Sequence, residues 1–253
     1  MIEKIWKKGQ KKGQVTVFII VAIVIALSLI IFFSVRGGLF KGEKVNPEIA
    51  GIHSFVEECV KEVGEDAVYQ IGQTGGYALY ADESTKNGIA YYFDKGRKLI
   101  PSKEQIEKEL AKYVNEQLSF CINDFEDFPD FDISERSIDS KAKIVKGKII
   151  FSVNYQLSIT KGENTYVLED FGVEVSSKLN TIYLVASEII AEQMLDYENI
   201  CINCISDIAF ENKVLVSMGD EGNDVIIFSI IDEKYKIKDK DYWFSFASRY
   251  DLG

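Results

Sequence analysis

The chain has 253 residues and a formal net charge of −11 at pH 7. Residues 1–14 hold five lysines and one glutamate, so the other residues together carry a charge of −15. An acidic polypeptide repels nucleic acid and anionic lipid headgroups, so we expect no nucleic-acid partner.

An uncharged apolar segment covers residues 15–33 and has the sequence VTVFIIVAIVIALSLIIFF. Its only polar side chains are Thr16 and Ser28. At a rise of ~1.5 Å per residue, these nineteen residues span roughly 28 Å as a helix, close to the ~30 Å hydrocarbon core of a bilayer. Backbone groups inside lipid need internal partners, so a spanning segment must be helical. The sequence therefore predicts one transmembrane helix over residues 15–36, with the lipid bilayer as a partner.

The charges beside this segment predict its orientation. The basic lead, residues 1–14, carries Lys4, Lys7, Lys8, Lys11 and Lys12. Lysine-rich flanks stay in the cytoplasm, so we expect a cytoplasmic N-terminus. A cleaved secretory signal needs a shorter apolar core and a small-residue site after it, whereas SVRGG follows here. We therefore expect a single-pass protein of the cell membrane, with a short linker over residues 37–47 and an extracytoplasmic domain over residues 48–253.

Lys12, Gly13 and Gln14, followed at once by the apolar segment, resemble the class III signal peptide of archaeal type IV pilin-like proteins. The resemblance implies that a prepilin-type peptidase cuts after Gly13, on the cytoplasmic side of the helix. That family commonly has a Glu at the fifth mature position, where it helps subunits dock into a filament, but this chain has Phe18. The exported part also resembles uncharacterised archaeal single-span membrane proteins, which implies no activity. A pilin-like subunit of a filament or secretion apparatus is therefore an alternative, and Phe18 argues against filament assembly.

The exported residues begin with a helical pattern. Apolar residues recur at three- and four-residue steps from Ile49 to Ala67, which predicts an amphipathic helix from about Pro47 to about Gly72. Asn46 is a candidate N-cap. The GQTGGY that follows is typical of a helix stop and a turn, and it lacks the Gly-Lys-Ser/Thr of a phosphate-binding loop.

Two short strands are predicted next, at residues 77–81 and 89–93. A second helix then begins with Ser102 as its cap, because Gln105 follows at the spacing of a capping box. Its apolar stripe runs to Cys121 and predicts a buried face.

An antiparallel sheet is predicted over residues 136–176. Apolar and polar residues alternate strictly from Phe151 to Thr160, and KGEN is typical of a hairpin turn. A third strand of this sheet is predicted at residues 141–145. The remaining predicted elements are a helix over residues 179–197 and strands at residues 213–217, 225–231 and 242–247. The expected fold class is α+β, with helices packed on antiparallel sheet and a candidate division into two subdomains near residue 133.

Two acidic stretches, DFEDFPDFD at residues 124–132 and GDEGND at residues 219–224, contain several carboxylates. The spacing of the first matches no calcium loop, so we expect an exposed loop whose Phe side chains turn inward. The second is better explained as a polar hairpin turn. Zinc needs four soft ligands, and the chain has one histidine. We therefore predict no metal site and no cofactor.

The four cysteines are Cys59, Cys121, Cys201 and Cys204. Disulfides persist in exported domains, and four cysteines allow three pairings. Cys59 and Cys121 each lie on the apolar face of a predicted helix, so we predict that they pair and that Cys201 pairs with Cys204. A thioredoxin-like redox motif at CINC needs a preceding strand and a helix that starts at the first Cys, whereas a helical pattern precedes it here.

No residue is selected as catalytic. His53 lies beside the apolar stripe of its helix, and no Gly-x-Ser-x-Gly motif accompanies it, so we expect a residue at the boundary of the core. The expected function is that of a surface-exposed, non-enzymatic structural or protein-interaction domain that binds an envelope or cell-surface protein. A second alternative is an anchored redox protein that uses Cys201 and Cys204.

Overall fold

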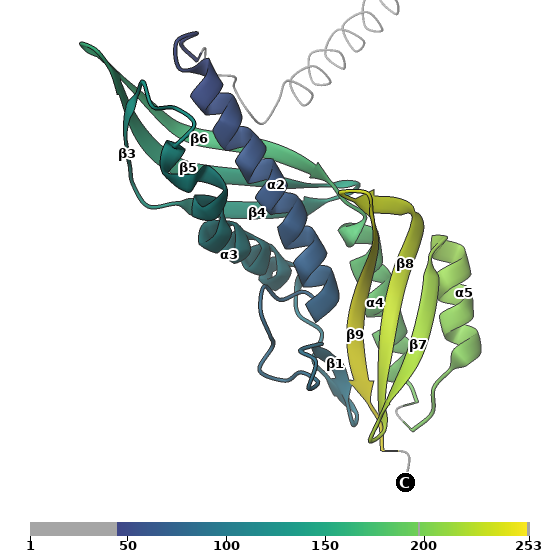
Figure 1. Cartoon of the computed structure of the whole chain (residues 1–253). Helices are drawn as coiled ribbons and strands as arrows, with labels where there is room; N and C mark the ends of the chain where they lie inside the picture. Colours follow the sequence, from purple (N-terminus) through teal and green to yellow (C-terminus); the bar gives the residue numbers. More distant parts are fainter. Residues whose placement is uncertain (1–44, 197, 252–253) are drawn as a thin grey trace, which may run out of the picture. The chain divides into compact units, whose positions relative to one another are not determined.

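The computed structural model describes residues 45–196 and 198–251, which belong to one compact unit, Val45–Gly253 (Figure 1). The basic lead, the predicted transmembrane helix, the processing site at Lys12, Gly13 and Gln14, and most of the linker lie outside the described residues. Among the described residues, no helix combines the length and the apolar character needed to span a membrane. The described part of the chain is α+β, as the sequence predicts.

Helix α2 (Ala50–Thr74) is the longest helix of the described residues, and its apolar stripe is buried as predicted. It begins after Ile49 rather than near Pro47, because Asn46 Oδ1 accepts the N–H of Glu48 and so caps a turn that precedes the helix. It ends at Gly75, whose φ of 74° is left-handed. This is the conformation for which glycine is favoured at a helix C-terminus.

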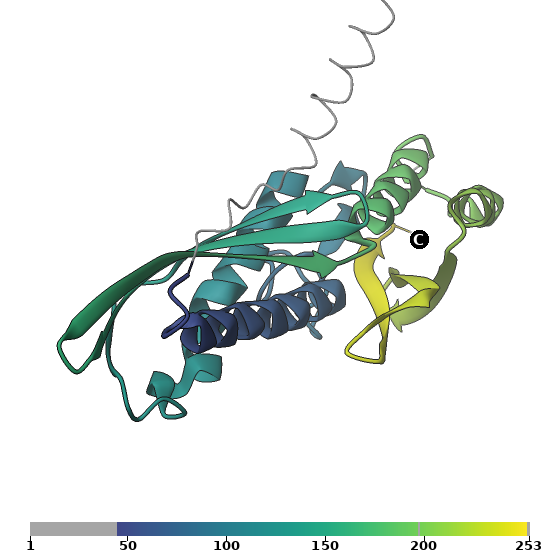
Figure 2. The same ribbon diagram turned by 90° about the horizontal axis from the view of Figure 1, so that it is seen from above.

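The first sheet is antiparallel. Its strands are β3 (Asp132–Glu135), β4 (Asp139–Val145), β5 (Lys148–Lys161) and β6 (Asn164–Ser176). β6 pairs along one edge of β5, while β3 and β4 pair with successive parts of its other edge. Alternate residues of β5 from Ile149 to Ile159 are buried, and α2 runs along this face of the sheet (Figures 1 and 2). The predicted alternation is confirmed.

Helix α3 (Lys103–Ile122) lies beside α2 and closes the outer edge of β4. Asn115 Oδ1 accepts the N–H of Ser140 at 2.8 Å, and Glu107 Oε1 accepts the N–H of Ile144 at 2.9 Å. An open strand edge is a template for pairing with another chain. These two side chains therefore take the place of a further strand at β4.

Both ends of α3 agree with the prediction. Ser102 Oγ accepts the N–H of Gln105 at 3.1 Å and caps the helix. After the helix, the acidic stretch at residues 124–132 begins within a 3₁₀ turn, η1 (Asn123–Phe125), and continues as a loop up to β3. Its Phe side chains turn inward, one fully and two partly buried.

The second sheet consists of β1 (Tyr91–Asp94), β2 (Arg97–Lys98), β7 (Leu215–Gly222), β8 (Val225–Ile237) and β9 (Lys240–Arg249), in the order β2-β1-β9-β8-β7. β1 runs parallel to β9, a pairing that corrects the expectation of purely antiparallel strands. Two-residue turns with positive φ, at residues 223–224 and 238–239, connect β7 to β8 and β8 to β9. Since β1 and β2 precede residue 133 and β7 to β9 follow it, this sheet joins the two halves of the chain.

Two helices accompany the second sheet. α4 (Leu179–Gln193) packs on it through Gln193, which accepts a hydrogen bond from Ser248 at 3.1 Å and donates one to the Tyr250 hydroxyl. α5 (Ile202–Asn212) follows and lies beside β7 (Figure 1). The predicted helix over residues 179–197 thus ends at Gln193, and α5 is not predicted from the sequence.

The segment between α2 and β1 is the other correction. The strand predicted at residues 77–81 does not form, because the N–H of Ala78 donates to Glu109 Oε2 at 3.1 Å rather than to a neighbouring strand. The strand predicted at residues 89–93 is β1, displaced toward the C-terminus.

Two glycines bring α2 close to both sheets. A Cβ at Gly64 would lie 2.9 Å from the ring of Phe151 on β5. A Cβ at Gly72 would lie 2.7 Å from the carbonyl oxygen of Trp243 on β9 and 2.8 Å from the Tyr242 ring. The ring of Phe151 can move slightly, whereas the backbone of β9 is held by its neighbours. Gly72 is therefore the tighter contact.

We predict that Gly72→Ala destabilises the protein by about 1–3 kcal/mol, because overpacking outweighs the gain in helix propensity. The control is Gly51→Ala in the first turn of α2, where the nearest atom, in Phe128, would lie 3.9 Å from the new Cβ. That change should stabilise the helix by up to about 1 kcal/mol. Urea denaturation of both variants measures the difference, and a Gly72→Ala variant as stable as Gly51→Ala would contradict the close approach.

Candidate functional site

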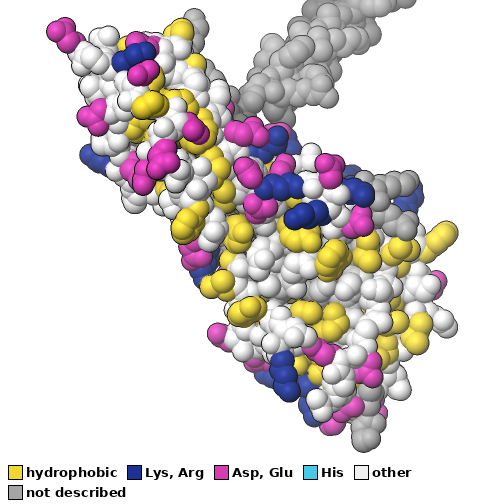
Figure 3. All heavy atoms as spheres, viewed as in Figure 1, with side chains coloured by type: hydrophobic (Ala, Val, Ile, Leu, Met, Phe, Trp, Pro, Cys, Tyr) yellow, Lys and Arg dark blue, Asp and Glu magenta, His cyan; other side chains and the backbone are white. Residues whose placement is uncertain are grey.

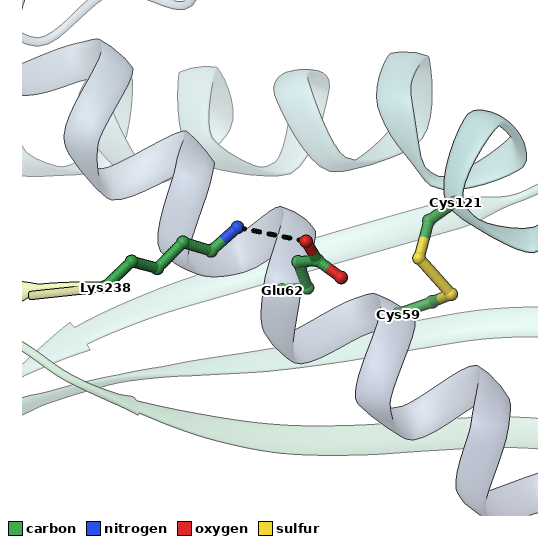
Figure 4. Close-up of a disulfide and its surroundings, with 4 residues drawn as sticks. All are labelled: Cys59, Glu62, Cys121 and Lys238. Atoms are coloured by element: carbon green, nitrogen blue, oxygen red, sulfur yellow. Dashed lines mark hydrogen bonds and ion pairs between the residues drawn. A yellow bond between two sulfur atoms is a disulfide. The ribbon is translucent and has the colours of Figure 1, made fainter.

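The Cys59–Cys121 disulfide joins α2 to α3 with a Cα–Cα distance of 5.7 Å, as predicted. Figure 4 shows the bond beside Glu62 on α2, which Lys238 reaches from the β8–β9 turn at 3.3 Å. Lys238 also lies 2.8 Å from Asp66. In the chain-entropy model this long loop gives about 4 kcal/mol of stabilisation. The disulfide and the lysine hold α2 to its neighbours, and we assign them a structural role.

The Cys201–Cys204 disulfide also forms as predicted, with a Cα–Cα distance of 5.3 Å, but its surroundings differ. Cys201 is the N-cap of α5, and its Sγ accepts the N–H of Cys204 at 3.3 Å. Cys201 is exposed and Cys204 is half-buried. The ring closed by this bond is small, so the same model gives about 2 kcal/mol. This disulfide is therefore a surface feature rather than a staple of the core.

The helix that begins directly after Cys201 changes the interpretation of CINC. The sequence places a helical pattern before this motif, whereas α4 ends at Gln193 and residues 198–200 directly before Cys201 are not helical. One condition of a redox-active CxxC, a helix start at the first Cys, is met. The other condition, a strand before it, is not met. No group of three or more ligating side chains that could hold a metal ion occurs among the described residues.

Exposed apolar side chains concentrate around the same two helices. Seven of the eleven large hydrophobic residues that are exposed in the described part of the chain lie between α4 and β7. We call them the apolar flank, in which Leu215 and Met218 lie on opposite faces of β7: Leu184, Met194, Leu195, Ile202, Phe210, Leu215 and Met218. Phe210 is 85% exposed and Leu195 is 80% exposed. In Figure 3, hydrophobic side chains reach the surface along the side where α5 and β7 lie in Figure 1.

The helices of the apolar flank lie against each other but α5 has little contact with the core. Asn212 Nδ2 donates to Glu188 Oε2 at 3.3 Å, which places the C-terminal end of α5 against α4. Ile205 is the one buried residue of α5. A helix that buries so little of its surface contributes little to folding, so its exposed apolar residues have no evident structural role.

The charge along α4 and α5 has a single sign up to Lys213, the exposed C-cap of α5. From residue 179 to residue 212 the chain has no Lys or Arg and six acids. These are Glu188, Glu192, Asp196, Glu198, Asp207 and Glu211. Five of the six are exposed, and Glu192 is half-buried. The apolar flank is therefore bordered by negative charge alone along α4 and α5.

His53 and Glu107, two further titratable side chains, make contacts that stabilise the fold. His53 is half-buried, with Nδ1 3.4 Å from Glu57 Oε2 and its ring 5.3 Å from the Phe171 ring, which is the boundary position that the sequence predicts. The carboxylate of Glu107 pairs with Lys143 Nζ at 3.0 Å and with the edge of β4. These contacts fix helices to the first sheet and assign no chemistry to either residue.

Asp94 is the other buried carboxylate, with 4% of its side chain exposed. Arg249 Nε donates to it at 2.6 Å, and Arg97, which also binds Glu83, donates from β2. The hydrogen bond from Arg249, with that from Arg97, outweighs desolvation and holds the pKa of Asp94 below its usual range. This group ties β1 and β2 to β9.

No family model, no curated protein and no solved structure matches the chain. A function therefore has to be inferred from its own residues. The sequence predicts the pairing of Cys201 with Cys204, but it does not predict which apolar side chains of the flank are exposed. The signal for α5 was present in the three-residue spacing of Ile202, Ile205 and Ile208, which fits one face of a helix.

Because the pKa of Asp94 is lowered in the fold, its contribution to stability is complete above the unfolded pKa of about 3.9 and is lost as the pH falls through the folded pKa. We predict that Asp94→Asn lowers the free energy of unfolding by about 1–3 kcal/mol near neutral pH. The gap between wild type and variant should be constant above about pH 5 and should shrink as the pH falls below about 4.

Urea denaturation across this pH range measures the gap. Asp251→Asn is the matched control, because Asp251 is 79% exposed and lies 3.5 Å from Lys95. Its effect should stay below about 0.5 kcal/mol. A gap for Asp94→Asn that is constant or grows toward acid pH would contradict the assigned ion pairs.

Proposed function

We propose that the chain is a membrane-anchored protein whose extracytoplasmic domain docks a partner protein on the apolar flank. The anchor and its orientation follow from the uncharged segment at residues 15–33 and the lysines before it. Both cysteine pairs form disulfides, and such bonds persist in oxidising compartments outside the cytoplasm, which supports export.

The observation that carries the docking role is the concentration of exposed apolar side chains on one flank. Single exposed apolar residues are ordinary on a protein surface, but a group around two adjacent helices is typical of an interaction site. Phe210, Leu195 and Ile202 are 85%, 80% and 60% exposed. A few side chains near the centre of an interface supply most of its binding energy, and the aromatic ring of Phe210 is the candidate anchor.

The acids along α4 and α5 define the chemistry of the partner. A second copy that used the same face would bring acids against acids, which disfavours a symmetric dimer through this flank. An anionic lipid surface is disfavoured for the same reason. The partner that fits is a protein surface or amphipathic helix with apolar anchors and lysines or arginines around them.

The first test concerns topology. Protease added to intact cells should digest residues 48–253, because the lysines of the lead keep only the N-terminus inside. Immunoblotting with an antibody against the domain measures its loss, and a cytoplasmic protein that remains intact serves as the control. A domain that resists protease in intact cells and is digested after lysis would contradict export.

The second test concerns the flank. We predict that the full-length chain binds a synthetic amphipathic helix with a Leu/Phe face and a Lys face, and binds the same helix with Glu in place of Lys at least about tenfold more weakly. Phe210→Ala should weaken binding of the Lys peptide by about tenfold or more, since an aromatic anchor is lost. Isothermal titration calorimetry measures both.

Phe120→Ala on α3 is the matched control, because Phe120 is 77% exposed and lies away from the flank in sequence. It should leave binding unchanged. Glu188→Lys combined with Glu211→Lys leaves four acids against two lysines and should reduce the preference for the Lys peptide. Equal binding of both peptides, or equal losses for Phe210→Ala and Phe120→Ala, would contradict the proposed docking site.

A further inference from the structure

The two sulfurs of the Cys201–Cys204 disulfide are not equivalent. Cys201 is exposed at the N-cap of α5, while Cys204 is half-buried in its first turn. An incoming thiolate therefore reaches Cys201 Sγ first. A thiolate at Cys201 would also lie at a helix N-terminus, where backbone N–H groups and the helix dipole stabilise negative charge.

We infer that Cys201 and Cys204 form a dithiol–disulfide exchange site whose substrate is a polypeptide with two thiols. A substrate thiolate attacks Cys201 Sγ, the Cys201–Cys204 bond breaks, and Cys204 leaves as a thiolate that takes a proton from water. The second substrate thiolate attacks the substrate sulfur of the mixed disulfide and releases Cys201 as a thiolate, which is protonated in turn. The substrate loses two electrons and two protons, and the cysteine pair gains both.

The N–H of Cys204 favours the second step. It donates to Cys201 Sγ at 3.3 Å in the disulfide, and the same N–H is placed to stabilise the thiolate that leaves. The exposed acids Glu198 and Asp207 oppose this effect. We therefore expect slower exchange than at a site with basic neighbours.

The second disulfide of the protein is the internal comparison. Cys59 is buried, and its bond with Cys121 closes a loop of sequence separation 62, compared with 3 for Cys201 and Cys204. Reduction of the larger loop releases more chain entropy and needs access to the core. A thiol reagent should therefore distinguish the two bonds in the native protein.

The side chains around the pair suit a polypeptide substrate. Ile202 lies between the two cysteines in sequence and is 60% exposed, and Leu195 precedes them and is 80% exposed. Apolar residues beside an accessible disulfide can hold an extended apolar segment while exchange takes place. The exchange does not rest on the docking role, since a short peptide is enough to test it.

The experiment uses the purified full-length chain in its oxidised form and a synthetic peptide with two cysteines, under anaerobic conditions. The expected result is one peptide disulfide per chain, measured by chromatography. Alkylation and peptide mapping should then find free thiols at Cys201 and Cys204 and an intact bond between Cys59 and Cys121. Oxidised glutathione, a small-molecule disulfide, should restore the pair.

Two single variants test which sulfur reacts. Cys204→Ser leaves the exposed Cys201 thiol, and Cys201→Ser leaves the half-buried Cys204 thiol. Mixed-disulfide formation with an activated peptide disulfide should be at least about tenfold faster for Cys204→Ser. Thermal denaturation verifies that both variants are folded.

Several outcomes would overturn the inference: no peptide oxidation, free thiols at Cys59 and Cys121 as readily as at Cys201 and Cys204, or equal trapping rates for the two variants. Each is independent of whether amphipathic peptides bind the apolar flank. A protein that docks its partner and fails these assays would retain the proposed function and lose the exchange site.

Discussion

The close approach of α2 to both sheets is the contact on which the rest of the fold depends. Gly64 faces the Phe151 ring of the first sheet, and Gly72 faces the backbone of β9 in the second. Because glycine has no side chain, α2 can pack closely against both sheets at these two positions. The Cys59–Cys121 bond and the contacts of Lys238 then fix α2 to α3 and to the β8–β9 turn. This helix makes the described residues one unit rather than two.

The sequence predicts those parts of the fold that depend on interactions between residues close together in the chain. The period-two pattern of β5 and the cap at Ser102 each depend on residues a few positions apart, and both are confirmed. The parallel pairing of β1 with β9 depends on residues more than 150 positions apart, and no local pattern encodes it. Residues 77–81 have the composition of a strand, but Glu109 from α3 takes the hydrogen bond of Ala78.

The candidate site was partly predictable for a similar reason. The pairing of Cys201 with Cys204 followed from their spacing and the pairing of the other two cysteines. The start of α5 did not, because the sequence predicts a helix over residues 179–197 before the motif and no helix after it, whereas α4 ends at Gln193 and α5 begins at Ile202. The exposure of Phe210 also cannot be predicted from a sequence pattern. An apolar residue on an amphipathic helix has the same spacing whether its face meets the core or solvent.

The two disulfides differ in how much of the core depends on them. The Cys59–Cys121 bond lies between two helices that cover the first sheet, so its loss affects the core. The Cys201–Cys204 bond lies at the start of a helix that buries only Ile205. Opening it, covering it with a partner or changing its exposed neighbours disturbs few core contacts. Local stability is lowest where few apolar contacts hold an element, and binding and exchange chemistry tend to use such elements. Helix α5 therefore combines the exposure needed for recognition with few contacts to the core that α2 organises, while α4 beside it is held by its buried face.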